Sequence, residues 1–325
     1  MLAACRAHGT AAEGPPERPA EERPAAAAAA APADVAVGGG LEYEVRAGDS
    51  LTSVSARFGV EVSALASSNG LAPEAWLRVG QRLRIDNLHL VPGWLERGIL
   101  INVPQRMLFL FRDGRVAGAF PVGLGRPDWP TGLGHYRIAS RVRDKTWIVP
   151  PSIQEEMRAA GKPVLTEVPP GPDNPLGGYW LGLEGVACGI HGTIAPASVY
   201  RFRSHGCIRV HPDDIAALFA QAEVGEPVEL VYRPLLLAAT AEGRVLLEVH
   251  RDVYGSAEPT EQALCAQASA TGLLARLDWT RAAETIAAAE GLARDVTASA
   301  PGDASGCPAP QAPRKLEPRS QAGSG

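Results

Sequence analysis

Long apolar runs are absent from this 325-residue sequence, and so are closely spaced cysteines. No stretch approaches the roughly 18 uninterrupted apolar residues that a membrane-spanning helix requires, so we expect no such helix. No two of the five cysteines have the Cys-x-x-Cys spacing of a zinc ribbon or a thioredoxin-type site. An excess of basic residues is absent as well, because the net charge is −5, which argues against a nucleic-acid scaffold.

Aromatic residues make up only 6% of the chain, whereas it has 35 glycines and 28 prolines, which predicts long loops and linkers. A hydrophobic content of 46% with 21% charged residues is typical of a globular protein, and the length allows two or three domains. The odd number of cysteines fits one reactive thiol and others with separate roles. The sequence leaves open whether Cys265 and Cys307 pair in an oxidising compartment.

The first forty residues contain few large apolar side chains. The opening residues up to Cys5 resemble the end of a bacterial lipoprotein signal, although the basic and apolar regions that precede such a cysteine are missing. We expect the true start to lie upstream, with a lipid anchor on Cys5; the alternative is a chance match in an alanine-rich chain. Residues 6–40 are expected to form a disordered tether, and residues 301–325 a disordered tail.

Residues 41–86 predict a small unit in the order strand, helix, helix, strand. The first strand includes Tyr43, and the apolar residues of 51–58 then recur at helical spacing. A second helix is expected from Val62, and a strand returns at 79–85.

This segment resembles a LysM domain. The resemblance is carried by Tyr-Glu-Val-Arg-Ala-Gly-Asp-Ser-Leu at 43–51, Asn-Gly-Leu at 69–71 and Val-Gly-Gln-Arg-Leu at 79–83. It implies that the loops between strand and helix bind the N-acetylglucosamine-containing glycan of cell walls. For Leu51 the alternative is a structural place in the thin core of so small a domain. The residues that the resemblance implicates in glycan binding are Gly48, Asp49, Ser50, Leu51, Asn69 and Gly70.

After a linker at 87–98, residues 99–233 predict a domain that is mostly β. Asp113 and Gly114 are a strong hairpin signal between two of its strands. One helix is expected from Pro212, with two acidic residues at the positive end of its dipole. The long connection 150–178 is rich in proline and glycine and is expected to be a lid or a binding wall. Strands are expected at 99–103, 107–112, 115–122, 134–140, 179–183, 186–191 and 228–232.

Residues 234–300 are expected to form a small α/β extension. A hairpin turns at Glu242 and Gly243, and helical patterns follow near 259–271 and 280–290. The sequence gives this extension no functional assignment.

The chemically informative residues are His-Gly-Thr at 191–193 and Ser-His-Gly-Cys-Ile-Arg at 204–209. A free cysteine has a pKa of about 8.5, so only a few per cent is thiolate at neutral pH. A histidine within hydrogen-bond reach supplies a base and later returns the proton to a leaving amine. His191 precedes Cys207 by 16 positions, so a loop between them could bring the two side chains together.

The neighbours of Cys207 fit a nucleophile. Gly206 removes a side chain from the path of a substrate and frees two amides for a developing oxyanion, each worth about 3 kcal/mol. Arg209 lies on the same face as Cys207 if the chain is extended there, and its guanidinium suits a carboxylate.

Two other interpretations of Cys207 stay open. One is a buried small hydrophobe, which the polar residues around it make a poor fit. The other is a metal site made with His191, His205 and His211, but no carboxylate is evident as the base of a zinc hydrolase. We favour the nucleophile and expect neither a metal nor a cofactor. Cys188 alternates away from His191 and is expected to be a core residue.

The same residues resemble the catalytic motif of the L,D-transpeptidase (YkuD-type) family: a His-Gly, a spacer, Ser-His-Gly-Cys and an arginine two positions on. The resemblance extends to Pro-Val-Gly at 121–123, Trp-Ile-Val-Pro-Pro-Ser at 147–152 and the proline-rich segment 169–177. With a LysM-like unit ahead of it, the chain resembles periplasmic members from Gram-negative bacteria. The implied fold is multidomain: a βααβ LysM domain, a β-rich sandwich or barrel-like catalytic domain, and a small α/β extension.

The resemblance implies a cysteine acyltransferase of peptidoglycan. Cys207 would attack the bond between diaminopimelate and D-Ala of a tetrapeptide stem, release D-Ala, and pass the acyl group from a thioester to an amine. His191 would be the base and the Gly192 carbonyl its orienter, while His205 and Gly206 would shape the site. The residues expected to contact substrate are Arg209, Ser204, Tyr179 and Trp147. Trp180 could line the same groove, and for these three aromatic residues core packing is the alternative.

Several acceptors stay open. A second diaminopimelate would give a 3→3 cross-link, the lysine of an outer-membrane lipoprotein would give wall attachment, and water would give hydrolysis. The expected partners are peptidoglycan stem peptides and glycan, in the periplasm or cell envelope, with no nucleic acid and with membrane contact only through an anchor at Cys5. A hydrolase of the same fold and a non-catalytic wall-binding adaptor are the competing functions.

Overall fold

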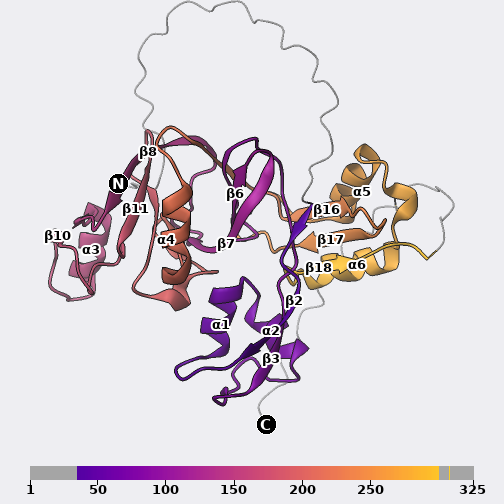
Figure 1. Ribbon diagram of the computed structural model, residues 1–325, viewed down its shortest axis with the longest axis horizontal. Coiled ribbons are helices and arrows are strands. Elements are labelled where there is room, and N and C mark those ends of the chain that lie inside the picture. The colour runs from indigo at the N-terminus through magenta and orange to yellow at the C-terminus, as the bar shows by residue number, and fades with distance from the viewer. Residues whose placement is uncertain (1–34, 300–306, 308–325) are drawn as a thin grey trace, which may run out of the picture.

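The structure is a computed structural model that describes residues 35–299 and Cys307. It has three parts: a small N-terminal unit at the bottom of Figure 1, a β-rich body at the centre and left, and a C-terminal extension at the right. No helix in the described part of the chain has the length and apolar character needed to cross a membrane. The expectations for Cys5 and for residues 1–34 lie outside the described residues, as do those for the tail apart from Cys307.

The N-terminal unit has the expected order strand, helix, helix, strand. Ser50 caps the first helix with its side chain, and Gly59 ends that helix in the left-handed conformation at φ 69°. The two strands pair antiparallel with Tyr43 opposite Leu83, and both side chains are buried. The elements are β2 (Gly40–Glu44), α1 (Leu51–Phe58), α2 (Val62–Ser68) and β3 (Arg82–Asp86).

Two expected linkers contain paired strands. β1 (Ala36–Val37) pairs antiparallel with β4 (His89–Leu90), so the expectations of a disordered tether up to residue 40 and of a plain linker at 87–98 are wrong at these positions. The reason is tertiary, because His89 and Leu90 are each only 1% exposed and lie against the C-terminal extension. Composition cannot reveal such a contact.

The central body is a nine-stranded sheet that closes on itself, which confirms the barrel-like expectation. Its strands are β5 (Gly98–Asn102), β6 (Met107–Arg112), β7 (Arg115–Gly125), β8 (Gly134–Arg143), β11 (Tyr179–Leu183), β12 (Gly189–His191), β13 (Phe202–Ser204), β14 (Ile208–Val210) and β15 (Pro227–Val231). They follow the order β13-β7-β14-β12-β11-β8-β15-β5-β6, and a further pairing of β6 with β7 closes the ring. The pairs β12–β14, β13–β7 and β15–β5 are parallel.

Helix α4 (Pro212–Gln221) packs on this body as the sequence predicts. Ile215, Leu218 and Phe219 lie on one face at helical spacing, and each is at most 7% exposed. His211, just before the helix, accepts the amide of Asp213 at 3.2 Å. Asp213 in turn forms an ion pair with Arg57 of helix α1 at 3.0 Å, which joins the N-terminal unit to the body.

The connection 150–178 is more structured than a loop. It contains helix α3 (Pro151–Ala159) and β10 (Glu167–Val168), which pairs antiparallel with β9 (Trp147–Ile148) just before the connection, and this region projects at the left end of Figure 1. Pro151 stands at the first turn of α3, where a proline is favourable because its missing amide would be unpaired in any case. The prolines of residues 150–178 predicted a loop, whereas Pro151 marks the start of a helix.

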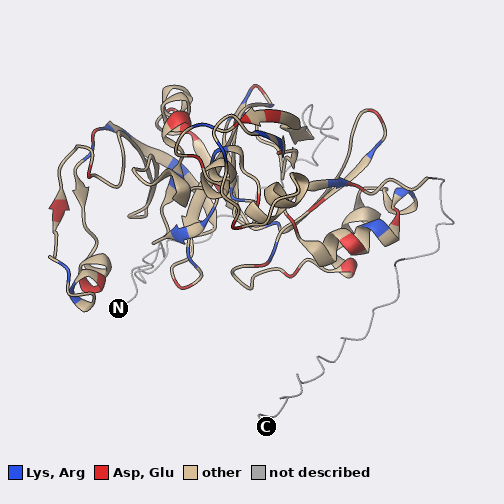
Figure 2. Ribbon diagram, turned by 90° about the horizontal axis from the view of Figure 1, so that it is seen from below, with Lys and Arg blue, Asp and Glu red and all other residues tan. Residues whose placement is uncertain are grey.

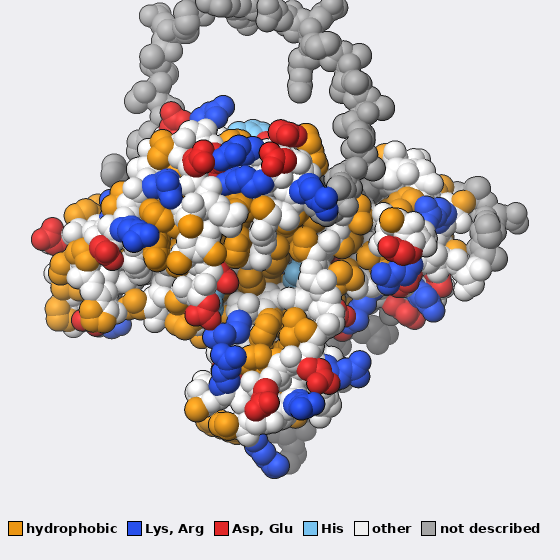
Figure 3. Space-filling model, in the orientation of Figure 1, with side chains coloured by type: hydrophobic (Ala, Val, Ile, Leu, Met, Phe, Trp, Pro, Cys, Tyr) orange, Lys and Arg blue, Asp and Glu red, His pale blue; other side chains and the backbone are white. Residues whose placement is uncertain are grey.

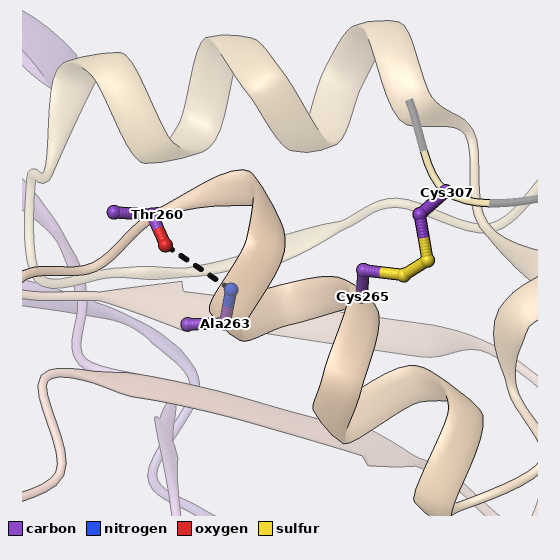
Figure 4. The surroundings of a disulfide bond; sticks show 4 residues. All are labelled: Thr260, Ala263, Cys265 and Cys307. Carbon is purple, nitrogen blue, oxygen red and sulfur yellow. Dashed lines mark hydrogen bonds between the residues drawn. A yellow bond between two sulfur atoms is a disulfide. The ribbon is translucent and has the colours of Figure 1, made fainter. Parts of the chain in front are cut away.

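The C-terminal extension forms a three-stranded sheet covered by helices, and the expected hairpin and both expected helices are confirmed. The third strand was not foreseen, since it has three residues with a single buried side chain. A disulfide joins Cys265 of the first helix to Cys307, with Cα atoms 5.7 Å apart (Figure 4). The elements are β16 (Leu235–Ala239), β17 (Val245–Val249), α5 (Glu261–Ala270), η2 (Leu274–Arg276), α6 (Trp279–Ala288) and β18 (Ala293–Asp295).

A buried polar cluster connects the extension to the rest of the molecule. The carboxylate of Glu248, on β17, accepts His89 Nδ1 and His250 Nε2 at 2.8 Å each, the Leu90 amide at 2.5 Å and Gln105 Nε2 at 3.0 Å. Burial acts to raise the pKa of Glu248, but the charges and hydrogen bonds of the two histidines lower this pKa from 4.5 to about 2. The extension is thus fastened by a charged, desolvated contact.

On the face shown in Figure 3, the described Lys and Arg side chains lie among Asp and Glu side chains, and both kinds are spread along the ribbon in Figure 2. This distribution agrees with the small net charge of −5.

Candidate active site

The sheet places the end of one strand beside the start of another at the centre of the site. β12 and β14 are parallel neighbours with His191 opposite Arg209. The chain between them, which includes η1 (Pro196–Ser198), returns so that Cys207 precedes β14. His191 and Cys207 are therefore adjacent and hydrogen-bonded through their side chains.

The thiol of Cys207 is only half-buried and is electrostatically activated. A hydrogen bond from Cys188, followed by the hydrogen bond and the charge of His191, holds the pKa of the Cys207 thiol well below its ordinary value, against burial, which would raise it. His191 Nδ1 lies 2.5 Å from the Gly192 carbonyl oxygen. If Nδ1 donates to that oxygen, Nε2 is left to accept a proton from the thiol.

The turn before Cys207 is fixed by Ser204. Its hydroxyl donates to the Cys207 carbonyl at 2.6 Å and accepts the Gly206 amide at 3.1 Å. Gly206 has φ 104°, a conformation that side-chain-bearing residues rarely adopt. The expectation that the Gly206 amide is free for an oxyanion is therefore wrong in this conformation, and the expected substrate contact of Ser204 is taken up by the turn.

A cavity of about 450 Å³ opens in front of Cys207. Trp147 lines it, as do Arg209, His205 and residues of helix α3. Tyr179 does not line the cavity, because its ring packs on Phe219 at 5.0 Å, under helix α4. The structure thus brings Trp147 to the site and leaves Tyr179 in the packing of the body.

Arg209 is a charged group without a carboxylate partner among residues 35–299. Burial lowers its pKa, and the neighbouring Cys207 thiolate acts in the opposite direction. A half-buried guanidinium that faces a cavity and is not neutralised by the protein is suited to hold an anionic ligand.

Helix α3 forms one wall of the cavity and is held there by Glu156. The Glu156 carboxylate accepts Arg126 Nη2 at 2.6 Å and lies 3.0 and 3.1 Å from His205 Nε2. The hydrogen bonds of Arg126 and then of His205 lower the pKa of Glu156. His205 also meets the Trp129 ring edge-to-face at 5.1 Å. Glu156 was not expected at the site, because residues 150–178 were expected to form a loop.

Trp180, which was expected either to line the substrate groove or to pack in the core, packs directly on the histidine and does not line the cavity. It lies opposite His191 in the β11–β12 pairing, and the two rings stack with centroids 5.8 Å apart and planes 21° apart. Gly189 makes room for the indole, because a Cβ there would stand 2.6 Å from the ring and 2.6 Å from the Leu181 carbonyl. Trp180 therefore restricts the orientation of His191.

Cys188 belongs to the core, as expected, but it also interacts with Cys207. It is 3% exposed, and its thiol lies 3.3 Å from the Gly206 carbonyl oxygen. The contact was missed because a strand was expected over 186–191, whereas β12 begins only at Gly189. The alternation that points Cys188 away from His191 does not apply to the irregular chain before the strand.

The histidines do not gather into a metal site. Within the part of the chain that the structure describes, no three His, Cys, Asp or Glu residues are placed to hold an ion. His211 caps helix α4 and His205 pairs with Glu156, so two residues of the alternative metal site are engaged elsewhere.

Four of the residues expected to bind glycan surround the first turn of α1. Asp49 accepts the Tyr43 hydroxyl at 2.6 Å, and Ser50 caps the helix. Leu51 is 3% exposed and packs in the core of the unit, which favours its structural alternative. Gly48 is exposed, with open space beside it.

The second expected glycan-binding loop is also partly structural. The Asn69 side chain pairs with the Arg84 backbone through bonds of 2.7 and 2.9 Å, and so fixes α2 to β3. Gly70 is exposed and open. Trp76, which the sequence analysis did not single out, is 96% exposed on the following loop.

Comparison with known families agrees with this arrangement. The L,D-transpeptidase catalytic domain (YkuD) matches residues 96–230, and the LysM domain matches residues 43–86. The chain belongs to the L,D-transpeptidase (YkuD) family and carries a LysM domain.

Three relatives, each named as a probable or candidate L,D-transpeptidase, show the extent of the similarity. ErfK/SrfK of Escherichia coli K12 is 30% identical over 202 residues, 62% of this chain and 65% of the relative. YbiS of the same organism is 32% identical over 173 residues, 53% of this chain and 56% of the relative. YkuD of Bacillus subtilis is 30% identical over 178 residues, 55% of this chain and 91% of the relative. The chain thus spans less than two thirds of the first two.

Proposed function

We propose that this protein is a peptidoglycan L,D-transpeptidase that works through a thioester on Cys207. The observation that carries the proposal is the Cys207 thiol, hydrogen-bonded to His191, with a lowered pKa, at the edge of a 450 Å³ cavity. A thiolate in this setting is a nucleophile at neutral pH. Membership of the YkuD family supports the choice of reaction.

The proposed reaction has two acyl transfers. The Cys207 sulfur attacks the carbonyl carbon between diaminopimelate and D-Ala, and the C–N bond breaks as His191 gives a proton to the departing D-Ala amine. The amine of the acceptor then attacks the thioester, gives its proton to His191, and releases the thiolate. The Gly192 carbonyl would hold the imidazole in the tautomer that these steps need.

We assign substrate recognition to the cavity walls. Arg209 would pair with a carboxylate of the stem peptide, since no protein carboxylate among the described residues neutralises it. Trp147 and the first turn of α3 would contact the apolar parts of the stem. We further propose that His205 holds α3 in place through Glu156 while the stem is bound.

The LysM domain leads us to propose glycan binding and a place in the cell envelope. Gly48, Ser50 and Gly70 are the exposed members of the expected set, and the two glycines would leave room for a sugar chain near the two loops. Lipid attachment at Cys5 and an outer-membrane lipoprotein as acceptor stay proposals that the described residues do not address.

The test is incubation of the purified chain with a disaccharide-tetrapeptide, followed by mass spectrometry. We expect loss of D-Ala and cross-linked dimers, and we expect neither with Cys207→Ala. A carbapenem should add its mass to the wild-type protein and not to the variant. Activity or an adduct that survives in a folded Cys207→Ala protein would refute the assignment of the nucleophile.

Two competing outcomes are separated by the same assay. Tripeptide without dimers, in the presence of excess amine acceptor, would identify a hydrolase. Intact tetrapeptide, an unlabelled Cys207 and retained binding to insoluble peptidoglycan would identify an adaptor. Mass spectrometry of digested cell walls, with and without the gene, would then name the acceptor.

A further inference from the structure

Two cysteines that are not disulfide-bonded lie together in the described part of the chain. Cys188 stands one residue before β12 and Cys207 one residue before β14, and these strands are neighbours in the sheet. The Cys188 thiol lies 3.3 Å from the Gly206 carbonyl oxygen and also makes a side-chain hydrogen bond with Cys207. A second thiol is therefore in contact with both the nucleophile and the peptide unit that precedes it.

We propose that Cys188 is a positioning residue for the nucleophile: its single S–H proton is shared between the Gly206 carbonyl oxygen and the Cys207 thiolate, so that it stabilises the thiolate and fixes the Gly206 peptide. The inference rests on the proposed function, in which Cys207 attacks as a thiolate. Cys188 is enclosed by core side chains, whereas Cys207 faces the cavity. We therefore assign the proton to Cys188 and the negative charge to Cys207.

The Gly206 peptide is held from both sides. Its amide donates to Ser204 Oγ at 3.1 Å, and its carbonyl faces the thiol of Cys188. Gly206 has the left-handed φ of 104°, so the direction of the following Cys207 side chain depends on these contacts. A buried carbonyl that loses its donor tends to rotate toward another partner, and such a rotation would turn the sulfur away from His191.

The charged and titratable groups around the Cys207 sulfur are few. His191 approaches from β12 and Arg209 from β14, and the charge of each interacts with that of Cys207. His205 lines the same cavity, but its Nε2 is occupied by Glu156. Cys188 is the neutral donor in this set, so its removal changes the titration of Cys207 without altering any charge.

The test measures the rate at which iodoacetamide alkylates Cys207 as a function of pH, in the reduced full-length protein. Peptide mass mapping separates Cys207 from Cys188. We expect Cys188→Ala to raise the apparent pKa of Cys207 by about one unit, which lowers the alkylation rate about tenfold at pH values below both pKa values. Cys188→Ser should restore most of the profile, because a hydroxyl donates to the same acceptors.

The alternative is that Cys188 only fills space in the core. In that case Cys188→Ala would lower the melting temperature and leave the pH profile of Cys207 unchanged, and this result would overturn the inference. Ile190→Val is the matched control, since Ile190 is buried two residues after Cys188, within β12, and the change removes one methylene group. It should lower stability modestly and leave the profile as in the wild type.

The profile is independent of the acceptor and of the substrate. A shifted profile in Cys188→Ala would therefore support the role of Cys188 even if no cross-linked product formed, in which case only the proposed function would fail. A transpeptidase whose Cys207 titrates identically in wild type and Cys188→Ala would retain the function and refute the role of Cys188.

Discussion

Replacing Glu248 with glutamine should destabilise the full chain by about 3 kcal/mol at pH 7. The native contacts lower the pKa of this carboxyl from 4.5 to about 2, and each unit of difference between the folded and unfolded states is worth about 1.4 kcal/mol. Breaking a buried ion pair by removing one partner typically costs a similar amount, about 3–5 kcal/mol. The loss should loosen the C-terminal extension from β4, where His89 lies.

The pH dependence gives the prediction its sign. A carboxyl with a depressed pKa stabilises the fold above its unfolded pKa, so the wild type should lose this contribution as the pH falls from about 4.5 toward 2. Burial acts to lower the pKa of His89, but the charge and hydrogen bond of Glu248 raise it above its ordinary value. The stabilisation that protonated His89 gives the fold is present below pH 6.5 and is lost as the pH rises through the folded pKa of His89. Glu248→Gln should show neither loss.

The assay is urea-induced unfolding, followed by circular dichroism and tryptophan fluorescence, at a series of pH values. Glu290→Gln is the matched control, because Glu290 lies in the same extension and forms only an exposed pair with Arg294. Its loss should change the free energy of unfolding by less than about 0.5 kcal/mol. The reasoning would be refuted by a Glu248→Gln protein whose free energy of unfolding at pH 7 equals that of the control. It would also be refuted if the variant lost stability between pH 4.5 and 2 as the wild type does.

Three further predictions concern the site and the extension. Trp180→Leu should lower kcat about tenfold with little change in KM, because His191 loses the ring that restricts it, and Trp180→Phe should retain most activity; steady-state kinetics decides. Glu156→Gln should raise KM for a tetrapeptide several-fold at an unchanged melting temperature, since it releases helix α3 from Arg126 and His205. Equal KM values for the variant and the wild type would contradict the role of Glu156 in holding α3 at the cavity. Cys265→Ser should lower the free energy of unfolding by about 2–4 kcal/mol through loss of the bond to Cys307, as should a reductant added to the wild type, measured by urea unfolding.

Local patterns predicted much of the fold. The hairpin at Asp113 and Gly114 forms with both residues at positive φ, as that turn type requires. Helix α4 starts at Pro212, and the C-terminal hairpin has its expected strands. These features depend on residues that are close in the sequence, where steric preferences and hydrophobic periodicity act directly. Helix α3 was missed because the prolines around its start also fit a loop.

The sequence by itself determined the chemistry that we propose for the site. The types and spacing of His191 and Cys207 indicated a thiol with a base, because few other arrangements of a histidine and a cysteine fit a polar, glycine-containing turn. The family motifs added the reaction class. Gly206 indicated an unusual backbone, and the structure has it at φ 104°.

Only the tertiary structure decided which distant groups surround that sulfur. Cys188 reaches Cys207 because the chain leaves the regular strand before Gly189, and Glu156 reaches His205 because helix α3 folds back over the cavity. Contacts of this kind depend on strand order, on where a strand becomes irregular and on what a helix packs against. They are set by the packing of the whole chain, which no local pattern encodes.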